Sequence, residues 1–135
     1  MQVPEHYTSD VLFFFDGKPL ELSLYQLLSE RMAEVLPDDV SVKVQKNQIS
    51  FYAPRLFAAA SLPVHRKKDW PRECLLVTFG LERQVISPRI AVAVEPYPNR
   101  WTHHVVVSQP EEIDGKLLDW LSQAYQFCQI KGSRR

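Results

Sequence analysis

The sequence predicts an α+β domain with a mostly antiparallel sheet of about five or six strands. Amphipathic helices from both chain ends are expected to pack on one face of that sheet. Near both termini, apolar residues recur at helical spacing. In the middle of the chain, apolar residues recur at every second position, as in strands. Helices and strands do not alternate regularly, which favours antiparallel pairing. We place a single domain at residues 8–130 and expect loose termini at 1–7 and 131–135.

Composition narrows the class of protein. The 135 residues suit one domain, and 45% hydrophobic with 24% charged residues is ordinary globular usage. A formal net charge of zero argues against strong, non-specific nucleic-acid binding, although it permits a local basic patch. No signal peptide and no apolar run of membrane-spanning length is present, so no membrane partner and a cytoplasmic location are expected. The two cysteines, Cys74 and Cys128, are predicted to be small buried hydrophobic residues.

Two helices are expected before residue 38. Thr8–Asp10 offers side-chain caps for a short helix at Val11–Phe15, and Asp16–Gly17 ends it. Pro19 begins the second helix, which ends near Leu36–Pro37. Its apolar stripe is formed by residues at helical spacing: Leu20, Leu24, Leu27, Leu28, Met32 and Val35. Its polar face consists of Glu21, Gln26, Ser29, Glu30 and Arg31.

Strands occupy the middle of the chain. Residues 40–44 and 48–52 alternate with period two around a turn at Lys46–Asn47, which predicts an antiparallel hairpin. Residues 75–79 form a continuous apolar run before Gly80, typical of a central strand. Further strands are expected at 57–62, 90–94 and 103–107. The proline-rich residues 95–100 are expected to form a turn or an extended loop.

A last helix follows residue 114. Asp114 is expected to cap it, and Ser108 with Glu111 and Glu112 suggests a capped turn just before it. Its apolar stripe contains Leu117, Leu118, Leu121, Ala124, Tyr125 and Cys128, with Trp120 beside it.

The segment from Arg100 to His104 is the strongest candidate for a binding site. Histidine titrates near neutral pH, and Trp101 offers a flat apolar surface. His103 and His104 are neighbours on a predicted strand, so they should point to opposite sheet faces. The alternatives are structural: Trp101 anchors a strand end in the core, and a histidine bonds to the backbone.

A second group of polar candidates lies on the predicted hairpin. Gln48, Ser50 and Tyr52 should share one face of the strand, and Arg55 follows them. The alternative is an ordinary solvated sheet face. Arg89 and Arg100, together with Arg83, would form an anion site if they converge, since guanidinium groups suit phosphate and carboxylate.

No complete catalytic motif is present. The chain lacks a Gly-rich phosphate loop, a nucleophile elbow and a third metal ligand beside the histidines, so no metal and no cofactor are expected. We therefore predict a non-enzymatic module that binds a small anionic or planar ligand or a protein partner. One alternative is a nucleic-acid-associated module that uses the basic loop 65–72 with Trp70. The other is a small enzyme in which His103 or His104 acts as general acid or base.

Several segments together resemble a known bacterial family. They are Gln45–Phe51, Leu76–Leu81, Ser87–Ile90, Arg100–Val105 and Ala124–Tyr125. The chain resembles, from about Val11 to Phe127, the domain of unknown function numbered "five-six-five-five". Asn47 stands where the family pattern has threonine, a change that a turn tolerates. The resemblance implies no activity and no catalytic residues. It implies relatives that occur alone or fused to predicted transport or nuclease-like modules.

Overall fold

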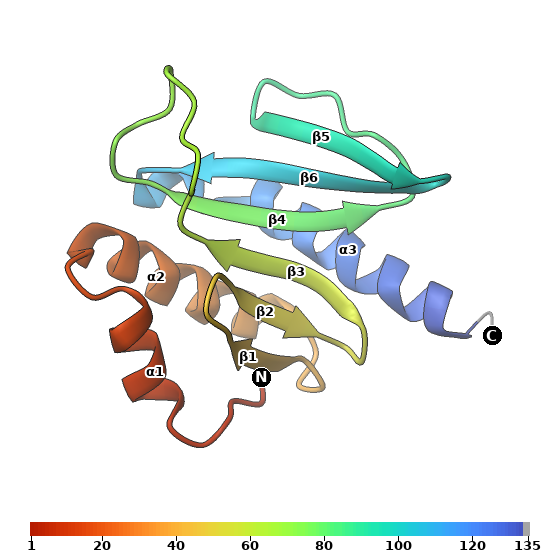
Figure 1. The fold of residues 1–135 in the computed structure, drawn as a ribbon. Helices are drawn as coiled ribbons and strands as arrows, with labels where there is room; N and C mark the ends of the chain where they lie inside the picture. The colour runs from red at the N-terminus through yellow and green to blue at the C-terminus, as the bar shows by residue number, and fades with distance from the viewer. Residues whose placement is uncertain (134–135) are drawn as a thin grey trace.

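Six strands form one sheet, and three helices lie against one face of it (Figure 1). The computed structural model describes residues 1–133, and the side chains of residues 1–130. Of the expected loose tail at 131–135, residues 131–133 belong to the last helix, and residues 134–135 lie outside the described residues. The elements, in chain order, are α1 (Tyr7–Phe14), α2 (Pro19–Val35), β1 (Ser41–Val44), β2 (Ile49–Tyr52), β3 (Leu56–Ser61), β4 (Leu75–Leu81), β5 (Ile90–Tyr97), β6 (Arg100–Val107), the 3-10 turn η1 (Pro110–Glu112) and α3 (Gly115–Ser133).

The strand order is β1-β2-β3-β4-β6-β5, and every neighbouring pair is antiparallel. The first four strands follow one another as a meander. The segment 82–89 then carries the chain past the position of β6 to the sheet edge, and the β5–β6 hairpin returns it to the interior. The predicted fold class, α+β with a mostly antiparallel sheet and helices from both chain ends on one face, is confirmed.

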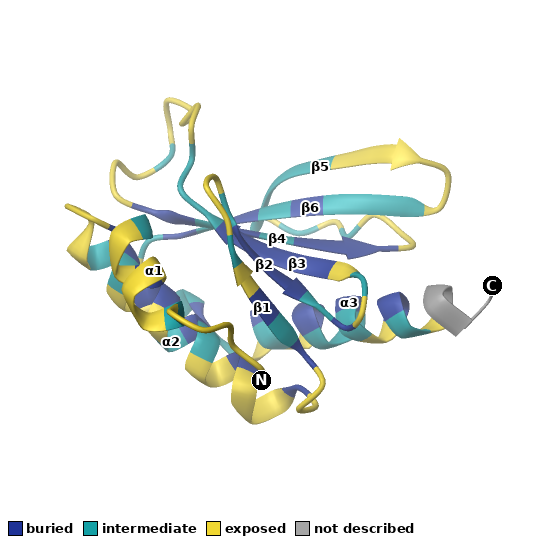
Figure 2. Ribbon diagram, turned by 60° about the horizontal axis from the view of Figure 1, so that its bottom comes forward, coloured by how far each residue is buried: buried dark blue, intermediate teal, exposed yellow. Residues whose placement is uncertain are grey.

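The helix-covered face carries the core. Phe79 of β4 stacks on Trp120 of α3 with ring centroids 5.7 Å apart. Phe15 contacts Tyr25 of α2, which in turn stacks near Phe51 of β2, so aromatic rings connect the N-terminal helices to the sheet. Figure 2 shows the buried residues concentrated in the middle strands and on the inner sides of the helices. This close packing of the helices on one face of the sheet makes the sheet rigid.

A bulge in β3 changes the direction of one side chain. Phe51 pairs with Ala58 and Tyr52 pairs with Leu56, so β3 has one extra residue, Phe57. Phe57 is buried against the Tyr125 ring of α3, with centroids 5.7 Å apart. The bulge thus turns a large aromatic side chain into the core and leaves small residues on the other side of β3.

We call the other side of the sheet the open face, because no helix covers it (Figures 1 and 2). Its residues follow from the strand register, since directly paired residues point the same way. One row crosses the sheet from β2 to β5. It consists of Ser50, Ala59, Thr78, His104 and Val92.

The predicted element positions hold with four corrections. The first helix begins at Tyr7, and Thr8–Asp10 lies inside it without capping it. Strand β5 continues through Glu95–Tyr97, so the predicted loop shrinks to a turn at Asn99, whose φ is 63°. Strand β4 runs through Gly80 to Leu81. Glu21, expected on the polar face of α2, is buried with only 2% of its surface exposed.

The N-terminal arm differs from a loose segment. The Gln2 N–H donates to the Val40 carbonyl at 2.7 Å, and the Val42 N–H donates to the Gln2 carbonyl at 2.9 Å. The arm therefore adds a short parallel bridge to the edge of β1. Among the described residues, no helix has the length and apolar character needed to cross a bilayer.

Candidate functional site

A small hollow of about 130 Å³ lies on the open face. We call it the Arg100 hollow. Its polar lining comes from two strands, β4 and β6, and from the β1–β2 turn: Gln48, Thr78, Arg100 and Thr102. Gly80 and Ala59 form its small-residue floor. Bulk water occupies about 30 Å³ per molecule, so the hollow has room for about four waters or one compact polar group.

The position of Arg100 depends on Gly80. The Arg100 guanidinium lies directly on Gly80, in the space where any other residue would place its Cβ atom. The same guanidinium lies 5.9 Å from the centre of the Phe127 ring of α3. Glycine inside a strand permits such close approach. Arg100 is thereby held flat at one end of the open face.

A second cavity, of about 200 Å³, adjoins the hollow and shares Arg100 with it. We call it the end cavity. Its remaining lining residues come from the segment before β3, the end of β5 and the end of α3: Arg55, Leu56, Tyr97, Phe127 and Cys128. Burial raises the pKa of the Cys128 thiol, while the nearby charges of Arg55 and Arg100 partly oppose that rise. Two arginines from distant parts of the sequence therefore act on one cavity.

A chain of hydrogen bonds fixes the wall formed by the hairpin. The Gln48 amide donates to the Ser50 hydroxyl at 2.7 Å, and that hydroxyl donates to Gln45 Oε1 at 2.6 Å. Ser50 is fully buried on the open face. Two of the predicted polar residues thus hold one another in place, and Gln48 keeps its carbonyl oxygen as an acceptor at the hollow.

Tyr52 lies at the outer edge of the same face. Lys43 of the neighbouring strand places its ammonium 4.7 Å from the centre of the Tyr52 ring. Tyr52 is half-buried and lines neither the hollow nor the end cavity. The predicted shared face of Gln48, Ser50 and Tyr52 exists, but the phenol lies apart from the arginines.

The two histidines point to opposite faces, as predicted. His104 lies on the open face, where its Nδ1 and the Thr78 hydroxyl are 2.8 Å apart. Burial lowers the pKa of His104, so its ring is neutral at pH 7. His104 positions Thr78, which lines the Arg100 hollow.

His103 lies on the helix-covered face and is completely buried. Its ring stacks on Phe79 with centroids 5.0 Å apart, and its Nε2 accepts the Val85 N–H at 2.9 Å. Burial lowers the pKa of His103, the Phe79 backbone opposes this shift in part, and the positive charge of Arg83 adds a smaller lowering. Its buried Nδ1 has no hydrogen bond of ordinary geometry. His103 therefore holds the segment 82–89 in place, away from the hollow.

Trp101 points to the other face of the sheet from its neighbour Arg100. It pairs with Leu81 on the helix-covered face and is half-buried. It lines neither the Arg100 hollow nor the end cavity.

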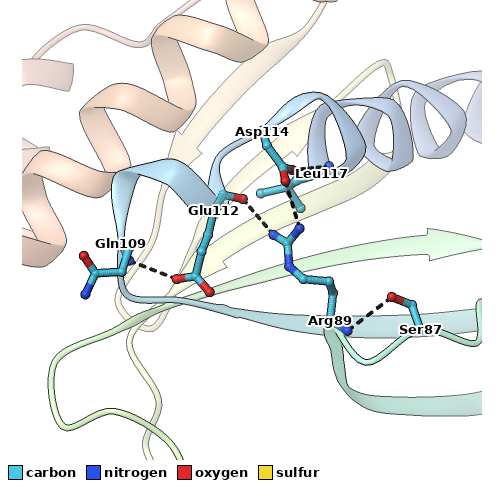
Figure 3. Close-up of polar contacts among 6 residues, drawn as sticks. All are labelled: Ser87, Arg89, Gln109, Glu112, Asp114 and Leu117. Atoms are coloured by element: carbon cyan, nitrogen blue, oxygen red, sulfur yellow. Dashed lines mark hydrogen bonds and ion pairs between the residues drawn. The ribbon is translucent and has the colours of Figure 1, made fainter.

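Arg89 does not converge with Arg100. It lies at the opposite end of β6, where its guanidinium bonds to Asp114 Oδ2 at 3.1 Å and to the Glu112 carbonyl at 2.7 Å (Figure 3). Arg83 instead bonds to the Gln123 side chain at 2.7 Å. The three arginines named from the sequence therefore lie apart, and the pair that meets is Arg55 and Arg100.

Of the residues that line the hollow, only Gln48 and Arg100 were predicted from the sequence, and the unpredicted ones include Thr78, Gly80 and Thr102. Gly80 carried a usable signal, because a glycine inside a strand often marks a close approach. The two threonines look like ordinary strand residues, and only the register brings them beside Arg100. Among the described residues, no group of three or more His, Cys, Asp or Glu side chains is arranged to hold a metal ion.

Comparison with known proteins gives a family and no further relatives. No curated protein and no solved structure matches the chain. Residues 14–128, most of the chain, match one family model. This agrees with the resemblance carried by the hairpin, β4 and β6 segments, and the chain belongs to the family described as "Domain of unknown function (DUF5655)".

Proposed function

We propose that this protein is a non-enzymatic binding module that holds a small anion bearing a carboxylate or phosphate group. The observation that carries the proposal is the convergence of Arg55 and Arg100 on the end cavity, which shares Arg100 with the Arg100 hollow. Among the described residues, none that lines either cavity is acidic. Neither arginine forms an ion pair within the part of the chain that the structure describes, and a guanidinium fork is well matched to the two oxygens of such an anion.

The other lining groups suit binding better than catalysis. Thr78 and Thr102 offer hydroxyls, and Gln48 offers an amide oxygen. Cys128 is kept as the neutral thiol, which is a poor nucleophile. His104 reaches the hollow only through Thr78. The free, buried state of both cysteines agrees with a reducing, cytoplasmic location.

The test is a titration with inorganic phosphate and with succinate, followed by NMR chemical shifts and by thermal unfolding. We expect saturable shifts at Arg100, Thr102 and Gly80. A ligand at a hundredfold its Kd stabilises the folded state by about 2.7 kcal/mol, which raises Tm measurably. Arg100→Ala should weaken binding at least tenfold, and Arg100→Lys should restore only part of it, because a lysine loses the planar fork.

The control is Arg31→Ala, which removes an exposed arginine from α2 on the other side of the molecule. It should leave anion binding unchanged. Absence of saturable binding of either anion would refute the proposal, as would equal losses in Arg100→Ala and Arg31→Ala.

A further inference from the structure

A larger cleft, of about 430 Å³, lies at the other end of β6. We call it the Trp70 cleft. One wall is the β3–β4 loop, which rises beside the beginning of β5 (Figure 1). The lining residues are Lys67, Asp69, Trp70, Pro71, Pro88, Arg89, Ile90, Ala91, Val106, Ser108 and Glu112. The volume lies in the usual range for sites that bind small molecules.

The Trp70 wall is held by its own hydrogen bonds. The Trp70 N–H donates to the Lys67 carbonyl at 3.0 Å, which closes a turn. The Arg66 guanidinium donates to the Trp70 carbonyl at 3.3 Å from outside that turn. Trp70 is half-buried, so it sits on a formed turn with part of its surface still exposed. A positioned, partly exposed indole is suited to stack on a flat ring.

The opposite wall is also fixed. Arg89 is bonded to Asp114 and to the Glu112 carbonyl, so its charge is already compensated (Figure 3). Glu112 Oε1 accepts hydrogen bonds from the N–H groups of Ser108 and Gln109 at 2.8 and 2.9 Å. The cleft therefore has two organised walls that need little rearrangement on binding.

The side chains that line the Trp70 cleft carry charges of both signs. The loop carries Arg66, Lys67, Lys68 and Arg72 against Asp69 and Glu73, in a chain of zero net charge. Arg66 is committed to the Trp70 carbonyl, which leaves Lys67 as the lysine that lines the cleft. The carboxylates of Asp69 and Glu112 line it as well. A bare anion would face the carboxylates of Asp69 and Glu112 as well as Lys67, whereas a ring with N–H donors can donate hydrogen bonds to those carboxylates.

We infer that the Trp70 cleft binds a nucleobase, which stacks on Trp70 while its phosphate meets Lys67. The carboxylates favour bases that carry an exocyclic amino group, such as adenine, over thymine. This site is separate from the Arg100 hollow and stands whether or not that hollow binds anions. The base belongs to a free nucleotide or to a single strand, and both present the same ring and phosphate.

The experiment titrates the full chain with adenosine monophosphate, an eight-residue oligo-deoxyadenylate and an eight-residue oligo-deoxythymidylate. Binding is followed by NMR at the Trp70 indole N–H and by anisotropy of labelled strands. Stacking on an aromatic side chain contributes about 1–3 kcal/mol per base. Trp70→Ala should therefore weaken binding at least fivefold, and Trp70→Phe should retain most of it. Lys67→Ala should weaken binding by less and flatten its salt dependence.

Matched controls identify the site. Arg31→Ala removes an equal charge from the helix layer and should have no effect. Arg100→Ala should also leave nucleotide binding unchanged, and if it abolished binding the ligand would occupy the hollow and the assignment to Trp70 would be wrong. The unchanged spectrum of core residues in Trp70→Phe checks that the fold is intact.

The relative affinities for the monophosphate and the oligo-deoxyadenylate distinguish a free nucleotide from a single strand as the source of the base. Equal affinity for the monophosphate and the oligo-deoxyadenylate supports a free nucleotide. Much tighter binding of the strand, with a steep loss between 50 and 200 mM salt, supports a single strand. An eight-residue polyglutamate that binds while all three nucleotide ligands fail would overturn the inference in favour of an acidic peptide. Failure of every ligand would overturn it as well.

Discussion

At the scale of single residues, Gly80 decides where Arg100 lies. The sequence predicted that the strand would stop before this glycine, because glycine usually weakens a strand. The strand continues, and the missing side chain is replaced by the guanidinium of Arg100. Neither residue alone indicates this contact. It depends on the pairing of Gly80 with Thr102, two positions from Arg100 on β6.

Gly80→Ala is predicted to displace the Arg100 guanidinium without removing it. The added Cβ would overlap the guanidinium, which sits at the free end of a flexible side chain and can move away. Alanine is favoured over glycine in a strand by about 0.5–1 kcal/mol. This gain opposes the loss of the guanidinium packing on residue 80, so the free energy of unfolding should change little. Phosphate binding should weaken severalfold. Urea unfolding and NMR titration measure the two effects separately.

The matched control for this variant is Gly115→Ala. A Cβ at Gly115 meets nothing within 4 Å, so the substitution leaves Arg100 in place. If Gly80→Ala and Gly115→Ala bound phosphate equally well, the packing of Arg100 on Gly80 would have no role in binding.

The histidines show which part of a site a sequence can specify. Strand alternation predicts that His103 and His104 face opposite sides, and they do. It does not say which side the helices cover, because that depends on how the whole sheet packs. The structure places His103 under segment 82–89 and His104 beside Thr78. The convergence of Arg55 with Arg100 has the same origin and leaves no trace in local spacing.

At the scale of elements, the start of α3 connects three segments. Asp114 Oδ1 accepts the Leu117 N–H at 3.0 Å, which caps the helix as the sequence predicted. Its other oxygen bonds to Arg89, which comes from the segment before β5 (Figure 3). The cap could be predicted because its two partners are three residues apart. The Arg89 contact could not, since it spans 25 positions.

Asp114→Ala is predicted to destabilise the protein by about 1–2 kcal/mol, the usual loss for an N-cap. It removes both the cap and the partner of Arg89. Asp114→Asn should retain most of the cap and lose the ion pair, which is partly exposed and contributes little. Urea unfolding measures both. A loss in Asp114→Asn as large as in Asp114→Ala would show that the ion pair, rather than the cap, stabilises α3.

Two elements were misread for identifiable reasons. The hydroxyl and carboxyl groups of Thr8–Asp10 suit a cap, but the helix begins earlier, after His6 with a φ of 64°. Prolines 96 and 98 suggested a loop, yet β5 is an edge strand, where proline is tolerated. In both cases local chemistry permitted two answers, and packing chose between them.

At the scale of the whole molecule, the fold class followed from periodicity, whereas the strand order did not. Alternation identifies strands, but the placement of β6 between β4 and β5 needs contacts between residues far apart. The burial of Glu21 could not be predicted for the same reason. Its position along the helix assigns it to the polar face, and only the packing of distant segments covers it.

Stability is predicted to fall as the pH drops from about 7 to 5. Burial lowers the pKa of His103 and of His104 below the ordinary value of 6.5. The unfolded chain then binds more protons than the folded one below about pH 6.5, so folding stability is complete above that pH and lost beneath it. The slope can reach about 1.4 kcal/mol per pH unit for each histidine. Urea unfolding across this range measures it.

The assignment is checked with His104→Gln, which should reduce the slope, and with the exposed His65→Gln, which should not. Asp114 does not contribute in this window. Burial alone would raise its pKa, but the Leu117 N–H and Arg89 hold it below its usual value, so its stabilisation fades only in stronger acid. A flat stability profile from pH 7 to 5 would contradict the prediction.

The one-sided layering of the molecule has a kinetic consequence. No residue of α1, α2 or α3 is among the described residues that line the Arg100 hollow and the Trp70 cleft, and the aromatic core lies on the helix-covered face of the sheet. A ligand can therefore enter and leave while every core contact stays closed, so exchange need not wait for a slow opening motion. Association should then be governed by diffusion and charge, and variants should differ mainly in how long the ligand stays.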